Sequence, residues 1–129
     1  MRIVIFIILL LTLVACFPNN PVKMSMTANP LPNTPEVVAA GKNLFEQHCQ
    51  LCHGSEGRGD GVAASSLASK PANLRQLKNK PEGLIAMRIK AGTSVMPAWK
   101  NILKEDEIWQ LTRYIKTISQ QEAQAGSNH

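Results

Sequence analysis

The segment Phe45–Gly61, "FEQHCQLCHGSEGRGDG", places two cysteines three residues apart and a histidine directly after the second. The chain has three cysteines in all, so the spacing of this pair is informative. A disulfide between Cys49 and Cys52 would close a loop too short to stabilise the fold much. A thioredoxin-like redox pair needs a βαβ surrounding, and a zinc site needs a second pair of ligands at zinc-like spacing. The sequence shows neither.

The histidine that follows the cysteine pair indicates a fourth possibility, apart from a disulfide, a redox pair and a zinc site. "CQLCH", from Cys49 to His53, has the form of a covalent haem c attachment site. The two thiols add across the porphyrin vinyl groups, and the adjacent imidazole is then held under the iron. The sequence therefore predicts one covalently bound haem c on Cys49 and Cys52, with His53 as an axial ligand of its iron.

A second axial ligand must come from the other histidines and the methionines of the exported chain. His48 adjoins an anchored cysteine and cannot cross to the far side of the haem, and Met87 is expected to fill the core of a helix. Met96 lies in the loop "AGTSVMPAW" and is followed by Pro97, which suits a side chain presented to a ligand. We favour Met96. The remaining candidates, Met24, Met26 and His129, lie in the tether and the tail.

The first seventeen residues, "MRIVIFIILLLTLVACF", predict export. Arg2 precedes an apolar run that is too short for a membrane span, which takes about 20 residues, so a signal peptide is expected. The run ends in "LVAC", which resembles the lipobox of bacterial lipoprotein precursors. That resemblance implies cleavage before Cys16 and lipidation of Cys16, and hence a lipid anchor on the periplasmic side of a bacterial membrane.

The rest of the chain is expected to form one all-α domain. Five of the eight prolines lie between Pro18 and Pro35, which favours an extended tether. Helices are predicted from Pro35, capped by Thr34, then over Pro81–Ala91, closed by Gly92, and over Lys104–Ser119. The predicted domain has roughly 85 residues, which is little for a stable hydrophobic core, so an internal staple is expected.

Taken together, these motifs resemble the class I c-type cytochromes, in particular the small bacterial mono-haem kind. The matching stretches are Gly41 to Phe45, "CQLCHG", "GRGDG", "KPANL", "SVMPAW" and "IWQLTRYI". The resemblance implies three to four helices wrapped round the haem, with the first and last helices crossing near Gly41 and with His53 and Met96 as axial ligands. In many relatives a proline stands where this chain has Val62, and its carbonyl accepts the imidazole proton. Lys104 replaces a usual helix-capping residue.

The resulting domain plan has four parts: a signal peptide (1–15), a lipidated tether (16–34), a cytochrome c domain (35–119) and a flexible tail (120–129). The expected function is that of a membrane-anchored electron carrier, not an enzyme, shuttling single electrons between redox partners. Two alternatives remain open. One is a haem sensor or small peroxidase with an open iron position. The other is a copper-handling lipoprotein that uses Cys49, Cys52, His53 and Met96 as soft ligands.

Charge indicates what kind of partner the domain meets. The formal net charge of the chain is +5, and basic residues concentrate between Lys70 and Lys90, where Glu82 is the sole acid. Because the protein is expected to be exported, we do not expect these charges to bind nucleic acid. The cluster is either an ordinary solvated face or a docking face for an acidic redox protein. Its members are Lys70, Arg75, Lys78, Lys80, Arg88 and Lys90.

Overall fold

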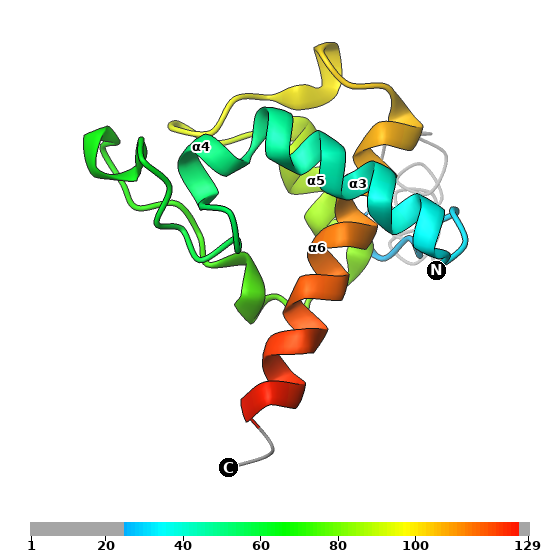
Figure 1. Ribbon diagram of the computed structural model, residues 1–129. Helices are drawn as coiled ribbons and strands as arrows, with labels where there is room; N and C mark the ends of the chain where they lie inside the picture. Colours follow the sequence, from blue (N-terminus) through cyan, green and yellow to red (C-terminus); the bar gives the residue numbers. More distant parts are fainter. Residues whose placement is uncertain (1–24, 127–129) are drawn as a thin grey trace, which may run out of the picture.

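The computed structural model describes residues 25–126, with side chains described up to Gln121. Four α-helices lie in residues 35–126, and no strand occurs in the described part of the chain (Figure 1). They are α3 (Pro35–His48), α4 (Gln50–His53), α5 (Glu82–Ala91) and α6 (Glu105–Gly126). Short 3-10 turns cover Ala64–Ser66, Leu74–Gln76 and Trp99–Asn101. The predicted all-α class is confirmed in the described residues.

Helix α3 begins where its capping residues predict. The side chain of Thr34 accepts a hydrogen bond from the backbone N–H of Val37 at 3.4 Å, and Pro35 occupies the first helical turn. Glu36 also lies in this first turn, where hydrogen bonds to the backbone and to Thr34 lower the pKa of its carboxyl. Negative charge is favoured there because the helix N-terminus carries a partial positive charge.

Helices α3 and α6 cross at Gly41, as the family resemblance implies (Figure 1). A Cβ atom on Gly41 would overlap the backbone carbonyl oxygen of Gln110, so only glycine allows this close approach. Next to the crossing, the rings of Phe45 and Tyr114 pack with centroids 5.3 Å apart. Phe45 and Leu111 are fully buried. The crossing therefore sets the direction in which α3 delivers the segment that follows it.

Helix α6 differs from the prediction at both ends. At its start, the carboxylate of Glu107 accepts a hydrogen bond from the backbone N–H of Lys104 at 2.7 Å, which supplies a cap although Lys104 cannot. At its end, the helix continues to Gly126, so the predicted end at Ser119 was wrong. The sequence after Ser119, "QQEAQA", lacks an apolar stripe, but glutamine, glutamate and alanine favour helix intrinsically.

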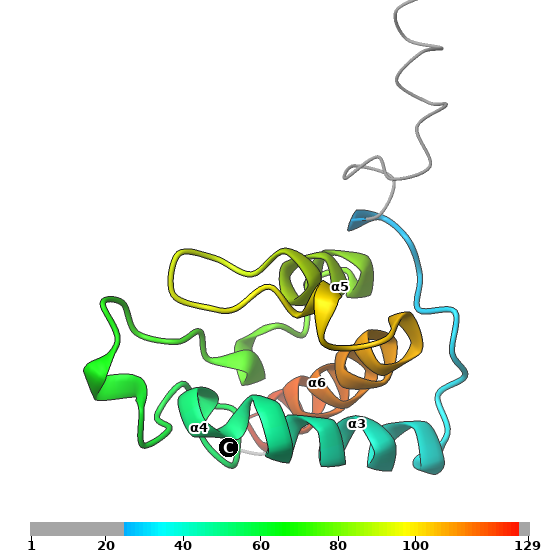
Figure 2. The same ribbon diagram turned by 90° about the horizontal axis from the view of Figure 1, so that it is seen from above.

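An N-terminal arm, residues 27–34, packs along α6 without regular structure (Figure 2). The side-chain amide of Asn29 donates a hydrogen bond to the carbonyl of Trp109 at 3.0 Å. Arg113 donates to the carbonyl of Leu31 at 2.8 Å and also pairs with Glu82 of α5 at 2.8 Å. The last part of the predicted tether is thus held on the domain. The predicted lipidation residue, Cys16, lies outside the described residues.

The two longest loops lie at the opposite end of the domain from this arm (Figure 2). One loop connects α4 to α5 through residues 54–81, and the other connects α5 to α6 through residues 92–104. Within residues 25–126, no helix is both long enough and apolar enough to cross a membrane. The loops and α4 surround the cavity described next.

Candidate functional site

The two cysteines and the histidine of "CQLCH" lie within one turn of helix. Cys49 is the C-cap of α3, and its N–H donates to the carbonyl of Phe45 at 2.8 Å. The chain then turns directly into α4, where the N–H of His53 donates to the carbonyl of Cys49 at 2.9 Å. This geometry brings the two sulfur atoms and the imidazole to the wall of one cavity.

That cavity has a volume of about 450 Å³, which is within the range of about 300–1,000 Å³ typical of sites for small ligands and cofactors. Its walls come from the end of α3, from α4 and α5, and from both long loops. The lining residues are His48, Cys49, Cys52, His53, Leu67, Ser69, Lys70, Pro71, Ala72, Arg88, Thr93, Ser94, Val95, Met96, Pro97 and Trp99.

The imidazole of His53 is held in one orientation. Its Nδ1 atom lies 3.0 Å from the carbonyl oxygen of Ala72. Because a carbonyl only accepts hydrogen bonds, Nδ1 carries the proton and Nε2 keeps its lone pair. Burial lowers the pKa of His53, and the bond to Ala72 offsets part of that effect. A neutral imidazole with its other nitrogen hydrogen-bonded is the usual arrangement of a metal-binding histidine.

The identity of this acceptor corrects the expectation placed on Val62. The side chain of Val62 is 84% exposed, and the carbonyl that meets the imidazole belongs to Ala72 in "KPANL". The reason is tertiary. The N–H of Leu74 donates to the carbonyl of Gly57 at 2.7 Å, and this bond brings residues 71–74 alongside the loop that follows His53.

The two thiols are half-buried and not joined in a disulfide. Burial, and secondarily the neighbouring Cys52, raise the pKa of Cys49 to about 12, so the neutral thiol is strongly favoured. In residues 25–121 no three side chains among the histidines, cysteines, aspartates and glutamates come together as a candidate metal site. The arrangement instead suits a group that reacts with two thiols and binds one imidazole.

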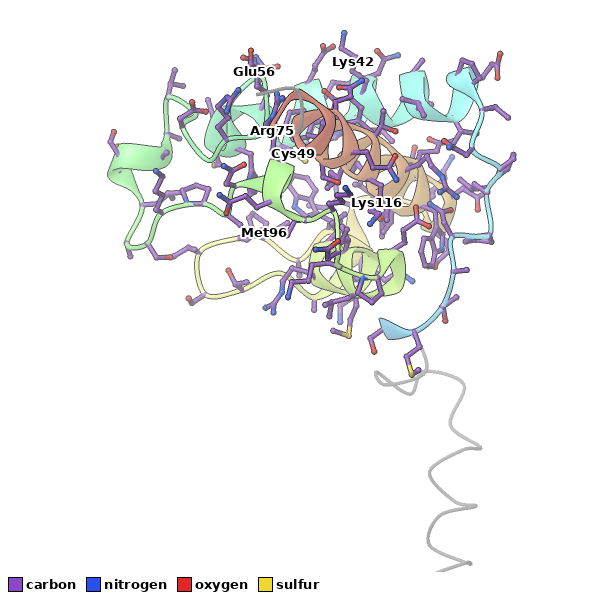
Figure 3. The ribbon with its side chains drawn as sticks, turned by 90° about the horizontal axis from the view of Figure 1, so that it is seen from below. Lys42, Cys49, Glu56, Arg75, Met96 and Lys116 are labelled. Carbon is purple, nitrogen blue, oxygen red and sulfur yellow. The ribbon has the colours of Figure 1, made fainter. Side chains whose placement is uncertain are left out.

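Met96 lines the same cavity from the loop after α5. Figure 3 labels Met96 together with Cys49, which also lines the cavity. Met96 is half-buried and packs against the hydrophobic core. Met87, within α5, does not line the cavity, and Met26, just before the N-terminal arm, is 79% exposed. Met24 and His129 lie outside the described residues. Met96 is therefore the methionine that the fold brings to the imidazole and the thiols.

Two cavity residues were not foreseen from the sequence. His48 was set aside as a ligand, yet its ring lines the cavity and packs against Trp99 with centroids 5.2 Å apart. Arg88 was assigned to the surface patch, and the structure places it on the cavity wall as well. His48 and Trp99 are far apart in sequence, and so are Arg88 and the "CQLCH" segment. No local pattern could therefore have indicated that these residues share a cavity.

The six predicted basic residues do not share one environment. Arg75 pairs with Glu56 at 3.4 Å, and both residues are labelled in Figure 3. Lys90 pairs with Glu105 at 2.5 Å. Lys70 is exposed at the rim of the cavity. Lys78 and Lys80 are also exposed, further along the same loop. The positive face is therefore narrower than the sequence suggested, because two of its charges have acidic neighbours.

Comparison with known proteins shows which family the chain belongs to. A family model described as "Cytochrome C oxidase, cbb3-type, subunit III" matches residues 36–115, which is more than half of the chain. The chain is 30% identical over 88 residues to the cbb3-type cytochrome c oxidase subunit FixP of Rhizobium meliloti (strain 1021), covering 67% of this chain and 29% of that protein. It thus spans less than a third of that subunit's length.

Two further matches cover the same domain. Cytochrome c6 of Euglena gracilis is 32% identical over 78 residues, which cover 60% of this chain and 87% of that protein. A solved chain of the Kuenenia stuttgartiensis reducing HAO-like protein complex Kustc0457/Kustc0458 aligns with a TM-score of 0.61 and 33% identity, over 69% of this chain and 46% of that one. The cavity residues fit the haem c that such domains carry, with two thiols and an imidazole on one wall and a thioether on another.

Proposed function

Since the chain belongs to the cytochrome c family of cbb3-type oxidase subunit III, we propose that it is a mono-haem electron carrier. Cys49 and Cys52 hold haem c through thioether bonds. His53 and Met96 are the two axial ligands of the iron. The protein passes single electrons between redox proteins and catalyses no bond change of its own.

The observation that carries this proposal is the position of Met96. The thioether reaches the cavity of the "CQLCH" segment from a loop more than forty residues further along the chain. A haem bound in this cavity would be held by the thiols of Cys49 and Cys52, and His53 and Met96 would supply its two iron ligands. A sensor or a peroxidase needs an open position, whereas the loop brings the thioether of Met96 to the cavity wall.

The residues of the site support electron transfer in three ways. When bound, haem iron supplies one-electron redox chemistry. The hydrogen bond from His53 to Ala72 fixes the imidazole, so its orientation need not change when the charge changes. A thioether opposite an imidazole favours the reduced state. Leu67, Val95 and Trp99 exclude water from the cavity wall, which limits solvent rearrangement on each transfer.

The covalent attachment is tested by the spectrum of the purified protein in alkaline pyridine after extraction with acidified acetone. We expect one haem c per chain to remain with the protein. Haem that leaves with the acetone, or a protein that contains copper and no haem, would contradict the proposal.

We further propose that the domain is exported and held at the membrane by lipid on Cys16. The support is the sequence "LVAC" at the end of an apolar run. Several acyl chains together anchor a protein stably, since each buried CH₂ contributes about 0.8 kcal/mol. We expect Cys16→Ser to move a haem-loaded domain from the membrane pellet into the soluble fraction. A variant that still sediments with membranes after a salt wash would refute the lipid anchor.

The proposed partner is an acidic redox protein that docks on the exposed cations Lys70, Lys78 and Lys80. A cationic face accelerates encounters with anions, by about tenfold or more at low salt. We expect the double variant Lys70→Glu/Lys78→Glu to slow oxidation by ferricyanide, an anionic reagent, by about tenfold at low salt. The control is Lys42→Glu on α3, where Lys42 already lies 3.6 Å from Glu46. The double variant changes the net charge by four units and Lys42→Glu by two, so half the logarithmic slowing in Lys42→Glu would assign the effect to net charge alone.

A further inference from the structure

The loop that carries Met96 is closed by a single side chain. The hydroxyl oxygen of Thr93 accepts hydrogen bonds from the backbone N–H of Met96 at 3.0 Å and of Val95 at 3.3 Å. In return, the backbone N–H of Thr93 donates to the carbonyl of Met96 at 2.8 Å. Both backbone polar groups of Met96 are thus bound by one residue, three positions earlier in the chain.

Gly92 connects this closed loop to α5. Its φ of +66° lies in the left-handed region, which suits glycine, and its N–H donates to the carbonyl of Arg88 at 2.9 Å. A Cβ atom on Gly92 would overlap the carbonyl oxygen of Met96. The end of α5 therefore fixes where Thr93 begins, and Thr93 fixes where the backbone of Met96 lies.

We propose that Thr93 is a positioning residue, whose hydroxyl holds the Met96 thioether in place as a ligand of the haem iron. This inference rests on the proposed function, in which Met96 binds the iron. A thioether is a weak ligand, so its hold on iron depends on how well the loop presents it. Without the hydroxyl, two backbone N–H groups lose their acceptor and the loop gains other conformations, in most of which the sulfur is turned away.

The exposure of Thr93 distinguishes this role from a general effect on stability. Its side chain belongs to the loop and the cavity wall and is not part of the hydrophobic core. Thr117, on α6, provides a matched comparison, because its hydroxyl donates to the carbonyl of Arg113 at 3.0 Å and it does not line the cavity. Replacing either threonine with valine removes a hydroxyl and leaves the side-chain shape almost unchanged.

The test is the affinity of the oxidised, haem-loaded protein for added imidazole, followed through loss of the sulfur-to-iron charge-transfer band. Imidazole must displace the thioether, so its apparent affinity rises with the fraction of protein in which the sulfur is detached. We expect Thr93→Val to bind imidazole about tenfold more tightly than wild type, the order of effect that losing two hydrogen bonds gives. Thr93→Ser keeps the acceptor oxygen, and we expect it and Thr117→Val to match wild type.

A second comparison isolates the action through Met96. In a Met96→Ala background there is no thioether to displace, so adding Thr93→Val should leave imidazole affinity unchanged. An unchanged affinity for Thr93→Val in the wild-type background would overturn the proposal, as would the same tenfold gain in the Met96→Ala background. If instead the wild-type protein lacks the charge-transfer band, the proposed Met96 ligation itself fails. The two failures can be told apart. If the wild type has the band and imidazole displaces the thioether equally in wild type and Thr93→Val, only the role of Thr93 is refuted.

Discussion

Replacing both Cys49 and Cys52 with alanine should leave a chain that neither retains haem nor folds cooperatively. The described core is small, and none of its buried hydrophobic residues lines the cavity, although Cys49, Met96 and Trp99 line the cavity and pack against that core. The buried hydrophobic residues are Phe45, Leu74, Ile85, Ala86, Ile89, Leu103, Ile108, Trp109, Leu111, Tyr114, Ile115 and Ile118. The haem is the part that completes this core.

The size of the cavity sets the scale of the effect. At about 24 cal/mol per Å³, a closed and empty space of 450 Å³ would cost about 11 kcal/mol, an upper figure because this cavity opens to solvent and its loops can collapse. Domains of this size are stable by only about 5–15 kcal/mol in total. Losing the haem therefore removes most or all of the margin.

The double variant is followed by circular dichroism on heating and by haem content after extraction with acidified acetone. Cys16→Ser is the matched control, since it also removes a cysteine and should keep both the haem and the cooperative transition. A Cys49→Ala/Cys52→Ala protein that unfolds cooperatively near the wild-type temperature would mean that the haem is not needed to complete the core.

Met96→Ala should keep its covalent haem and yet lose the redox properties of the wild type. The attachment residues and His53 are unchanged, so the haem stays in place. Without the thioether, the oxidised iron loses a soft ligand that favours the reduced state, and the midpoint potential should fall by on the order of 100 mV or more. The sulfur-to-iron band should vanish, and the reduced protein should bind carbon monoxide. An optical redox titration measures the potential and the band, and adding carbon monoxide to the reduced protein measures its binding.

Met87→Leu is the control for this prediction, because Met87 lies within α5 and does not line the cavity. The substitution roughly conserves volume and should cost less than about 1.5 kcal/mol of stability. Its spectrum and potential should match the wild type. If Met87→Leu abolishes the band while Met96→Ala keeps it, the assignment of the axial ligand is wrong.

Local signals in the sequence predicted the parts of the fold that depend on neighbours along the chain. Thr34 and Pro35 start α3 and Gly92 ends α5. The haem attachment motif is equally local, since it lies within one turn of helix. Each of these predictions depends on a few consecutive residues, whose chemistry allows few alternatives. The crossing of α3 and α6 at Gly41, by contrast, was expected only from the family resemblance.

What the sequence could not indicate depends on contacts between distant segments. The acceptor for His53 is a backbone carbonyl, and any residue type can supply one, so nothing marked Ala72 in advance. The bond between Arg113 and Leu31 joins residues 82 positions apart. The pairing of Lys90 with Glu105 likewise requires α5 and α6 to be packed first. The extension of α6 beyond Ser119 escaped prediction because it rests on helix propensity without an apolar stripe.

The most direct test of Met96 as a ligand and of single-electron transfer is an optical redox titration of the purified wild-type protein, with carbon monoxide added to the reduced state. We predict a single one-electron transition, a sulfur-to-iron charge-transfer band in the oxidised form, and no binding of carbon monoxide. A protein that lacks this band and binds carbon monoxide readily has an open iron position. That result would contradict Met96 as a ligand and favour a sensor or a peroxidase over an electron carrier.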